Sequence, residues 1–303
     1  MIVQEIMGKQ ITLALVGRGH WGKTYQKTIN EMTGFALPEK FIFGRDYKKR
    51  LKKINTADID GVIIAATTSA HFEIASFLLE NGFKNLLIEK PLTQTFQQAK
   101  KLDKLAKNTP DAKILVGHLM LYDPAWIAIK KSLKKLGNLS QINYAALKGP
   151  PIKEGTVLQD AGPHPIYLFM DIAGVPKKIT AKPKKFDNVE LTLEFENGLL
   201  GVAELGTIYP ERKRQIMIVG EKSQLILNEF VNPRQLQLIN QRGNYKLLRF
   251  STNKSPLELE ILEFARMIKD GKSSVPLASG MDVVKIIELA EESLSKHKVL
   301  SLR

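Results

Sequence analysis

The sequence predicts an α/β protein in which a Rossmann-type, doubly wound parallel sheet is followed by an α+β domain with an open-faced, mostly antiparallel sheet. Two observations carry this prediction. Short apolar runs alternate with helical segments over the first third of the chain, a pattern typical of βαβ units. Beyond Gly117 the pattern changes to closely spaced short strands with turn residues between them. We therefore expect a first domain over residues 1–120 and a second over 121–303, with the C-terminal helices able to pack back on the first.

The first domain is predicted from apolar runs and helix ends. A helix is expected to end at Asn81-Gly82, because an Asn-Gly pair favours the left-handed conformation that closes helices. The expected strands cover residues 11–16, 41–43, 60–66, 86–88 and 113–116. The expected helices between them cover residues 20–32, 70–80 and 96–107.

The second domain is predicted from hairpin signals. Glu196-Asn197-Gly198 and Gly220-Glu221-Lys222 separate neighbouring strands as tight turns do. Residues 190–196 alternate polar and apolar, which suits a sheet with one wetter face. The expected strands cover residues 142–147, 189–195, 199–205, 214–219, 224–227 and 245–250. Two helices follow, over 256–269 and 281–296, with Ser279-Gly280 expected to precede the second.

Composition limits the classes of function. The 303 residues include 45 Lys and Arg against 31 Asp and Glu, which gives a net charge of +14, and there is no cysteine. Disulfides, a thiol nucleophile and thiolate metal ligands are therefore excluded. The lysine clusters alternate with apolar residues as solvated helix faces do, and no nucleic-acid-binding motif accompanies them. With no signal pattern and no apolar run near ~20 residues, we expect a cytoplasmic protein that binds neither nucleic acid nor membrane.

The most informative motif lies directly after the first predicted strand. Gly17, Gly19 and Gly22 form a GxGxxG turn that opens a helix. In this pattern the first glycine allows a tight turn, the second lets the backbone approach a pyrophosphate, and the third lets helix and strand pack closely. The helix N-terminus supplies N–H donors for the phosphates. We predict a dinucleotide site here, with contacts from the residues between and beside the glycines: Arg18, His20 and Trp21.

A second motif is Glu89-Lys90-Pro91, which follows another predicted strand. Ligands of doubly wound sheets bind at the carboxyl ends of the strands. An ammonium there can stabilise an oxyanion that develops during hydride transfer. A cis bond before Pro91 would aim Lys90 at such a site. The alternative is an ordinary surface turn between strand and helix.

A third motif joins Asp160 and His164, four residues apart at the start of an apolar helical stretch. A carboxylate can orient an imidazole, and a neutral imidazole can act as a general base near pH 7. The alternative is a structural helix-capping Asp beside a buried His. No second histidine lies at metal-ligand spacing, so no metal site is expected.

These motifs, in this order, resemble the glucose–fructose oxidoreductase/inositol dehydrogenase (Gfo/Idh/MocA) family. The resemblance covers nearly the whole chain. It includes Thr67-Thr68-Ser69 with His71 after the third strand, Gly117-His118, and Tyr122 in the segment that enters the second domain. The resemblance implies an NAD(P)-dependent dehydrogenase or reductase that acts on CH–OH groups. It also implies a homodimer or homotetramer.

The resemblance further implies roles for individual residues. His164 would remove the hydroxyl proton of an alcohol substrate, Asp160 would support it, and Lys90 would steady the alkoxide. Further cofactor contacts are implied for Thr67, Thr68, Ser69, His71 and Glu89. Two positions depart from many relatives: Tyr167 stands where an Asp is common, and Asp171 where a Trp is common. Both changes indicate an altered fit to the substrate.

The choice of cofactor depends on the end of the second strand. NAD-binding relatives place an acid there to bond the ribose 2′-hydroxyl, whereas this chain has Gly44 followed by Arg45. An arginine can pair with a 2′-phosphate, so NADP(H) is favoured over NAD(H). Asp46 would be the NAD-binding acid if the alignment slips by two residues.

The expected substrate is a small polyhydroxylated molecule: a sugar, sugar nucleotide, cyclitol or related compound. Weaker candidates for contact with it are His118, Tyr122, Lys148 and Tyr167, and the loop 149–159 is expected to shape its choice. Two alternatives stay open. One is an NAD-dependent glycosidase of the same family, and the other is a non-enzymatic dinucleotide-binding regulator.

Overall fold

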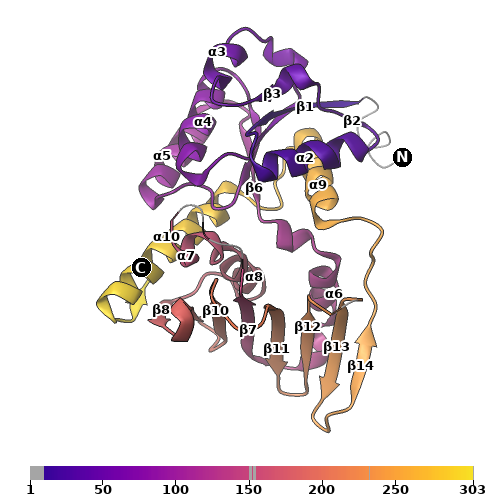
Figure 1. Cartoon of the computed structure of the whole chain (residues 1–303), viewed down its shortest axis with the longest axis vertical. Coiled ribbons are helices and arrows are strands. Elements are labelled where there is room, and N and C mark those ends of the chain that lie inside the picture. The colour runs from indigo at the N-terminus through magenta and orange to yellow at the C-terminus, as the bar shows by residue number, and fades with distance from the viewer. Residues whose placement is uncertain (1–9, 150–151, 153–154, 232, 303) are drawn as a thin grey trace. The chain divides into compact units, whose positions relative to one another are not determined.

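The structure, a computed structural model, describes residues 10–149, 152, 155–231 and 233–302. These residues form two compact units, and both are drawn in Figure 1. The first unit holds the described residues as far as Leu119 together with Lys254–Val284. The second holds Met120–Asn253 and the described residues from Lys285 onward. Within the described residues, no helix is both long and apolar enough to cross a membrane.

The first unit is built on a six-stranded parallel sheet, as the sequence predicts. The order of its strands is β2-β1-β4-β5-β6, and β3 also pairs with β1. Its central strands are almost wholly buried, because helices cover both faces of a parallel sheet. The strands are β1 (Ile11–Val16), β2 (Phe35–Ala36), β3 (Ile42–Phe43), β4 (Gly61–Ile64), β5 (Asn85–Glu89) and β6 (Lys113–Gly117).

Two helices of the first unit, α5 and α9, begin at residues whose side chains satisfy free N–H groups of the first turn. Thr95 and Ser255 each form a capping box, at the starts of α5 and α9. The helix α9 returns from late in the sequence and packs beside α2 (Figure 1). The helices are α2 (His20–Glu31), α3 (Tyr47–Leu51), α4 (Thr68–Glu80), α5 (Phe96–Asn108), α9 (Pro256–Asp270) and the first part of α10 (Leu277–Lys296).

The second unit is built on a nine-stranded mixed sheet with the order β14-β13-β12-β11-β7-β10-β9-β8-β15. Every pair is antiparallel except β7 with β10, so the mostly antiparallel sheet of the prediction is confirmed. Burial alternates along β9, as expected for a sheet with one covered face. The strands are β7 (Leu139–Leu147), β8 (Lys178–Pro183), β9 (Val189–Glu194), β10 (Leu200–Leu205), β11 (Lys213–Gly220), β12 (Ser223–Asn228), β13 (Gln235–Asn240), β14 (Tyr245–Leu248) and β15 (Leu300–Ser301).

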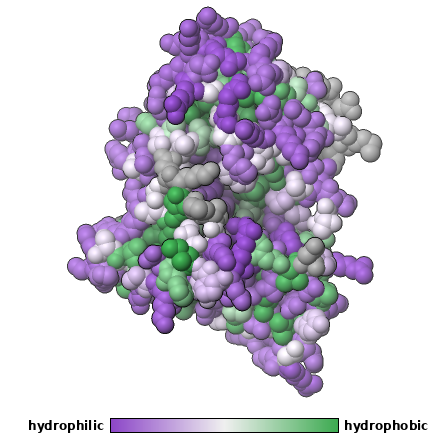
Figure 2. Space-filling view, in the orientation of Figure 1, coloured by the Kyte–Doolittle hydropathy of each residue, from purple (hydrophilic) through white to green (hydrophobic). Residues whose placement is uncertain are grey.

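The helices of the second unit are α6 (Pro124–Ser132), α7 (Val157–Asp160), α8 (Pro163–Ala173) and the last part of α10. Asp123 caps α6 by accepting a hydrogen bond from the backbone N–H of Ala125 at 2.8 Å. Phe169 of α8 packs against Gly201 on β10, which places this helix on the sheet. Hydrophilic side chains cover most of the visible surface of the molecule, as expected for solvated, lysine-rich faces (Figure 2).

Several predicted element boundaries were wrong. Strands β2, β8, β13 and β15 were not predicted, and the strand expected over 245–250 ends at Leu248. Ser279-Gly280 lies inside α10 and does not precede it. A Cβ at Gly280 would lie 2.8 Å from a methyl carbon of Val116, so this glycine serves close packing. Part of the 149–159 loop lies outside the described residues.

Candidate nucleotide and catalytic site

The glycine-rich turn joins β1 to α2 as predicted. Gly17 has φ +134°, and a Cβ there would overlap the carbonyl oxygen of Ala65. A Cβ at Gly22 would overlap the carbonyl oxygen of Gly17. Gly19 differs from both, because a Cβ there would meet no heavy atom within 4 Å. Gly17 and Gly22 are therefore required by the protein itself, whereas the space above Gly19 is open.

The start of α2 is free of a side-chain cap. Gly19 is the N-cap and has an extended conformation with no side chain to accept hydrogen bonds from the first turn. His20 and Trp21 begin the helix on its exposed side, with their rings in an edge-on contact at 6.1 Å. An uncapped helix N-terminus beside an open glycine fits a phosphate group.

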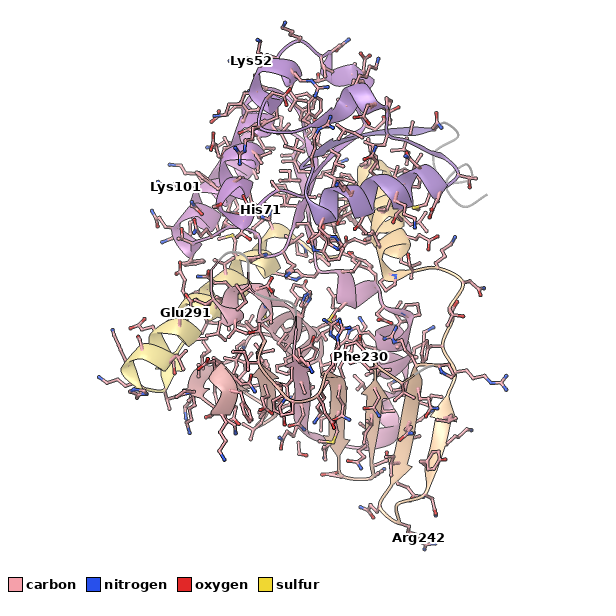
Figure 3. The ribbon with its side chains drawn as sticks, in the orientation of Figure 1. Lys52, His71, Lys101, Phe230, Arg242 and Glu291 are labelled. Carbon is pink, nitrogen blue, oxygen red and sulfur yellow. The ribbon has the colours of Figure 1, made fainter. Side chains whose placement is uncertain are left out.

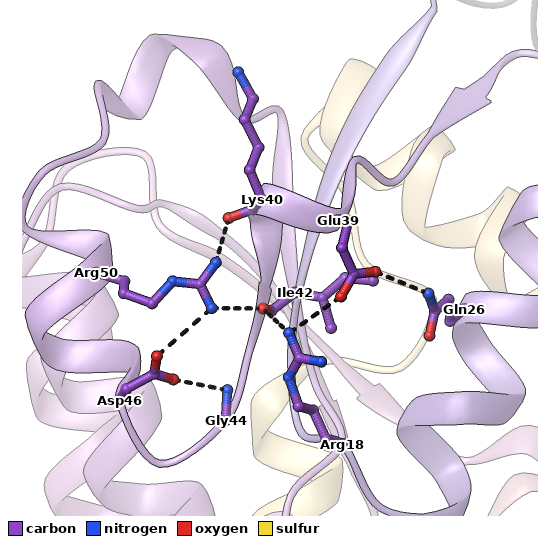
Figure 4. A network of polar contacts seen from close by, with 8 residues as sticks. All are labelled: Arg18, Gln26, Glu39, Lys40, Ile42, Gly44, Asp46 and Arg50. Carbon is purple, nitrogen blue, oxygen red and sulfur yellow. Dashed lines mark hydrogen bonds and ion pairs between the residues drawn. The ribbon is translucent and has the colours of Figure 1, made fainter.

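The end of β3 is surrounded by a polar network, shown in Figure 4. Arg18 donates to the carbonyl of Ile42 at 2.9 Å and pairs with Glu39 at 3.2 Å. Asp46 accepts from the backbone N–H of Gly44 at 3.2 Å, and its other oxygen lies 3.7 Å from Arg50. The carboxylate of Asp46 is thus engaged within its own turn.

The neighbouring Arg45 is exposed at the same end of β3. No carboxylate stands at Gly44, the position that follows the strand directly. The edge where a ribose is expected therefore presents a glycine and then a solvent-exposed guanidinium.

The turn after β4 brings Thr67 and Ser69 to the same end of the sheet. Thr67 precedes α4 as its N-cap, and its hydroxyl oxygen lies 3.3 Å from that of Ser69; Thr68 is the first residue of the helix. His71 is fully buried (Figure 3). Its ring nitrogens lie 3.0 Å from the carbonyl oxygen of Pro91 and 3.2 Å from that of Ala66. His71 thus links the turn after β4 to the turn after β5.

The Glu89-Lys90-Pro91 motif ends β5. Its Lys90–Pro91 peptide bond is cis. Glu89 is buried and accepts the backbone N–H of Lys90 at 3.1 Å and the hydroxyl of Tyr25 at 2.8 Å. Lys90 is half-buried. The carboxylate of Glu89 therefore holds the backbone of Lys90 and lies beside its ammonium.

His118 lies after β6, the strand next to β5, and only 3% of its surface is exposed. Burial lowers the pKa of His118 to about 3, and the positive charge of Lys90 adds to this effect. The imidazole is therefore neutral at physiological pH. A neutral ring beside a lysine does not compete with it for an anionic ligand.

Asp160 and His164 lie in the second unit, on two consecutive helices. Asp160 ends α7 and is exposed, whereas His164 lies in the first turn of α8 and is half-buried. The two helices meet at Gly162, where a Cβ would overlap the carbonyl oxygen of Leu158. The helix α7 is held by Glu291 of α10, which accepts hydrogen bonds from Thr156 and Gln159 (Figure 3).

The other predicted substrate contacts are scattered over the second unit. Tyr122 is half-buried in a short 3-10 turn, and Tyr167 is buried within α8. Lys148 has φ +56° and donates to the carbonyl of Pro210 at 3.0 Å. Asp171 accepts from the indole N–H of Trp126 at 2.8 Å and pairs with Lys130 at 2.9 Å. Asp171 therefore has a structural role of its own within the unit.

The structure thus brings the predicted cofactor residues together at one end of the first unit's sheet. The carboxyl ends of β1, β3, β4 and β5 carry, in turn, the glycine loop, Gly44, Thr67 and Lys90. This is the edge at which doubly wound folds bind nucleotides. Lys90 belongs to the first unit, and Asp160 and His164 belong to the second.

Sequence reasoning missed Tyr25 and Glu260. Both are completely buried, and the hydroxyl of Tyr25 lies 2.8 Å from an oxygen of Glu260 as well as from Glu89. A signal was present in the sequence. Glu260 lies on the buried stripe of α9 with Leu257, Ile261 and Phe264, where a charged residue is unusual.

Comparison with known proteins agrees with this geometry. Residues 39–118 match the model described as "Oxidoreductase family, NAD-binding Rossmann fold". The chain is 23% identical over 323 residues to scyllo-inositol 2-dehydrogenase (NAD(+)) of Bacillus subtilis, which covers 93% of each protein. Other curated relatives match over less of their length: the chain covers 42% and 39% of two uncharacterised Escherichia coli oxidoreductases, YdgJ and YhhX.

Solved structures share the fold over almost the whole chain. The chain matches a putative NADPH-dependent oxidoreductase from Desulfitobacterium hafniense with a TM-score of 0.85 and 18% identity, which covers 97% of this chain and 98% of that one. It also matches an inositol dehydrogenase homologue from Azotobacter vinelandii, which was solved with NADH and myo-inositol. The TM-score is 0.81 and the identity 17%, and the match covers 97% of this chain and 98% of that one.

The fold and the glycine-rich edge define an oxidoreductase class with an NAD(P)-binding Rossmann domain. Within that class, residues 39–118 match the Gfo/Idh/MocA family model, and inositol 2-dehydrogenases are among the curated relatives. The resemblance drawn from the sequence is therefore confirmed.

Proposed function

We propose that the protein transfers a hydride between NADP(H) and a hydroxyl or carbonyl carbon of a small polyhydroxylated molecule. The observation that carries the proposal is the carboxyl-end edge of the first unit, where an uncapped helix N-terminus and the open Gly19 follow β1 and Lys90 follows β5. A relative that covers most of the chain is an inositol dehydrogenase, which supports a cyclitol or sugar as the substrate.

The residues fit a dinucleotide. The first-turn N–H groups of α2 and the backbone at Gly19 would hold its pyrophosphate. Thr67, Thr68 and Ser69 would border the same edge. When bound, the nicotinamide ring accepts or gives up the hydride. The protein supplies the binding, the orientation and the proton chemistry.

The protein's own groups divide the remaining work. His164 would take the proton of the substrate hydroxyl at an imidazole nitrogen, because a histidine serves as a base near neutral pH. Asp160 would orient and charge-balance that imidazole. The ammonium of Lys90 would stabilise the negative charge that develops on the substrate oxygen. In carbonyl reduction each step runs in reverse.

The same three residues provide the test of activity. Lys90→Met and His164→Asn should fold and bind cofactor but lose hydride transfer by at least about 100-fold, in the range for a lost acid–base or oxyanion group. The measurement follows nicotinamide absorbance with a panel of cyclitols, sugars and sugar nucleotides. Lys101→Met, an exposed lysine on α5 (Figure 3), is the matched control. Turnover like that of the wild type in either site variant would overturn the mechanism.

The preference for NADP(H) is proposed from Gly44 and the exposed Arg45, together with the engagement of Asp46 by Gly44 and Arg50. Arg45→Ala should weaken NADPH binding by roughly tenfold, about 1.4 kcal/mol, and leave NADH binding nearly unchanged. Intrinsic fluorescence titration measures both. Lys49→Ala, which removes an exposed charge from α3, is the control. Equal losses for the two cofactors would assign Arg45 no role at a 2′-phosphate.

A further inference from the structure

Three polar side chains from distant parts of the sequence meet inside the first unit. Tyr25 comes from α2, Glu89 from the end of β5 and Glu260 from α9. The Tyr25 hydroxyl lies 2.8 Å from Glu89 Oε1 and 2.8 Å from Glu260 Oε1. Tyr25 and Glu260 are fully buried, and 7% of Glu89 is exposed. Because acidic side chains are seldom buried so deeply, two of them joined by one hydroxyl require an explanation.

The number of protons available to these three groups provides an explanation. A tyrosine hydroxyl carries one proton and can donate it to only one oxygen. The second carboxyl oxygen at 2.8 Å must then donate in its turn, since otherwise two lone pairs would face each other. One of the two carboxyl groups is therefore a neutral acid. Two carboxyl groups that share a buried site commonly hold one proton between them.

The surroundings place this proton on Glu260. Glu89 accepts the backbone N–H of Lys90 at 3.1 Å, and the positive charge of Lys90 lowers the pKa of Glu89, so both interactions favour its ionised form. Glu260 Oε2 has no hydrogen-bond partner among the described residues, which suits a neutral group and not a charge.

The directions of the pKa shifts agree with this assignment. Burial raises the pKa of Glu260 well above its usual range, and the negative charge of Glu89 raises it further. Burial also raises the pKa of Glu89, but the Tyr25 hydroxyl and the Lys90 charge oppose that shift. Burial raises the pKa of Tyr25 as well, so its hydroxyl keeps its proton. His118, the other titratable group near Lys90, is neutral.

The hydrogen bonds then run in one direction. Glu260 donates to Tyr25, Tyr25 donates to Glu89, and Glu89 accepts at its other oxygen from Lys90. Hydrogen bonds in a chain of this kind strengthen one another. The chain ends at the carboxylate that holds Lys90, where donors from both sides fix its charge and its orientation.

We propose that the chain Glu260–Tyr25–Glu89 is a positioning device for Lys90, with a neutral Glu260 at one end and an ionised Glu89 at the other. Glu260 and Tyr25 are positioning residues that act through Glu89. The catalytic role of this chain of hydrogen bonds rests on the proposed function, because it requires Lys90 to serve in hydride transfer. The location of the proton does not depend on that function.

An infrared experiment on the purified protein tests the location of the proton. The carbonyl stretch of a protonated carboxylic acid is separate from that of a carboxylate. The wild type should show this band at pH 7, Glu260→Gln should lack it, and Glu89→Gln should retain it. A wild type without the band, or a band lost in Glu89→Gln and kept in Glu260→Gln, would overturn the proposal. No substrate or cofactor is needed.

A kinetic comparison tests the link to Lys90. Glutamine can replace the donor of a neutral acid, whereas leucine cannot. Glu260→Leu should lower kcat, whereas Glu260→Gln should keep a kcat close to that of the wild type. Tyr25→Phe should lower kcat by roughly tenfold with KM and NADPH affinity nearly unchanged, and it should alter the pH profile of kcat. Thermal unfolding separates these effects from loss of folding.

The outcomes are distinct. Equal losses in the glutamine and leucine variants, or kcat and a pH profile like those of the wild type in Tyr25→Phe, would overturn the positioning role. A wild type that transfers no hydride to any substrate would count against the proposed function and against Lys90's part in it. The infrared bands would in that case still decide where the proton lies.

Discussion

The glycines of the nucleotide loop, Gly17–Gly22, and the glycines at β10 of the second unit meet different neighbours. In the first unit, a Cβ at Gly17 or Gly22 would overlap backbone carbonyl oxygens. In the second unit, a Cβ at Gly201 would overlap the ring of Phe169, and one at Gly206 would overlap the side-chain amide of Asn188. Backbone atoms cannot move without the fold, whereas side chains can adopt other rotamers. The nucleotide loop is therefore fixed by main chain, whereas the two glycines at β10 face side chains that can adjust.

Buried polar groups show a related difference. The first unit buries Glu89, Glu260 and His118 close to the carboxyl ends of its strands. In the second unit, the buried Asp123 is paired with Arg234 at 2.9 Å, and the arginine side chain remains 30% exposed. Buried titratable groups are therefore concentrated in the unit that carries the proposed nucleotide site. Such groups, with shifted pKa values, are common near functional sites.

The substitution with the largest expected effect lies in the nucleotide loop. Gly17→Ala places a Cβ on a residue with φ +134° and against a backbone oxygen. We expect it to destabilise the protein by at least about 3 kcal/mol, or to prevent folding. Urea unfolding measures the change. A variant as stable as the wild type would show that this loop can relax, which would remove the contrast with the glycines at β10.

Gly19→Ala is the matched control within the same loop. Its Cβ meets nothing within 4 Å, so the free energy of unfolding should change by less than about 0.5 kcal/mol. NADPH affinity should nevertheless fall by roughly tenfold or more, because the methyl group would occupy the path of a pyrophosphate. Unchanged affinity would place the pyrophosphate elsewhere.

A second effect concerns the buried imidazole of the first unit. The pKa of His118 is lowered to about 3 by burial, whereas an unfolded histidine has a pKa near ~6.5. The stability that comes from keeping His118 neutral is therefore fully present above pH 6.5. It is lost as the pH falls toward 3, with a slope of up to about 1.4 kcal/mol per pH unit.

His118→Gln removes this titration. We expect the free energy of unfolding of the wild type to fall faster than that of the variant between pH 6.5 and the acid limit of the measurement. Parallel curves for the two proteins would contradict the prediction. Proton NMR of the His118 ring at pH 5 gives an independent check, because the ring should still be neutral there.

The fold could be predicted from the sequence where local signals are strong. Strand β1 was predicted to the residue and α5 to within one, because an apolar run and a cap define them. Strands β8 and β13 were missed: β8 carries lysines and a proline, and β13 carries glutamines, so neither has a simple apolar run. Their place in the sheet depends on neighbours that are distant in sequence.

The same distinction applies to the candidate site. The glycine loop and the Lys90–Pro91 turn are local, so their residues and backbone geometry could be predicted. The contact of Tyr25 with Glu260 joins residues 235 positions apart, and no pattern around Tyr25 indicates it. The roles of Asp160 and His164 remain predictions. The weaker substrate candidates Tyr122 and Tyr167 belong to the second unit, where their surroundings follow from packing.

A last substitution sharpens the contrast from the side of β10. Gly201→Ala sets a methyl group against the buried ring of Phe169. Because a side chain can shift where a carbonyl cannot, we expect a loss of about 1–3 kcal/mol, less than for Gly17→Ala, and no change in NADPH affinity. Adding Phe169→Leu should recover part of the loss in a double-mutant cycle. A cost equal to that of Gly17→Ala without recovery would show that a side chain confines Gly201 at β10 as firmly as a backbone carbonyl confines Gly17.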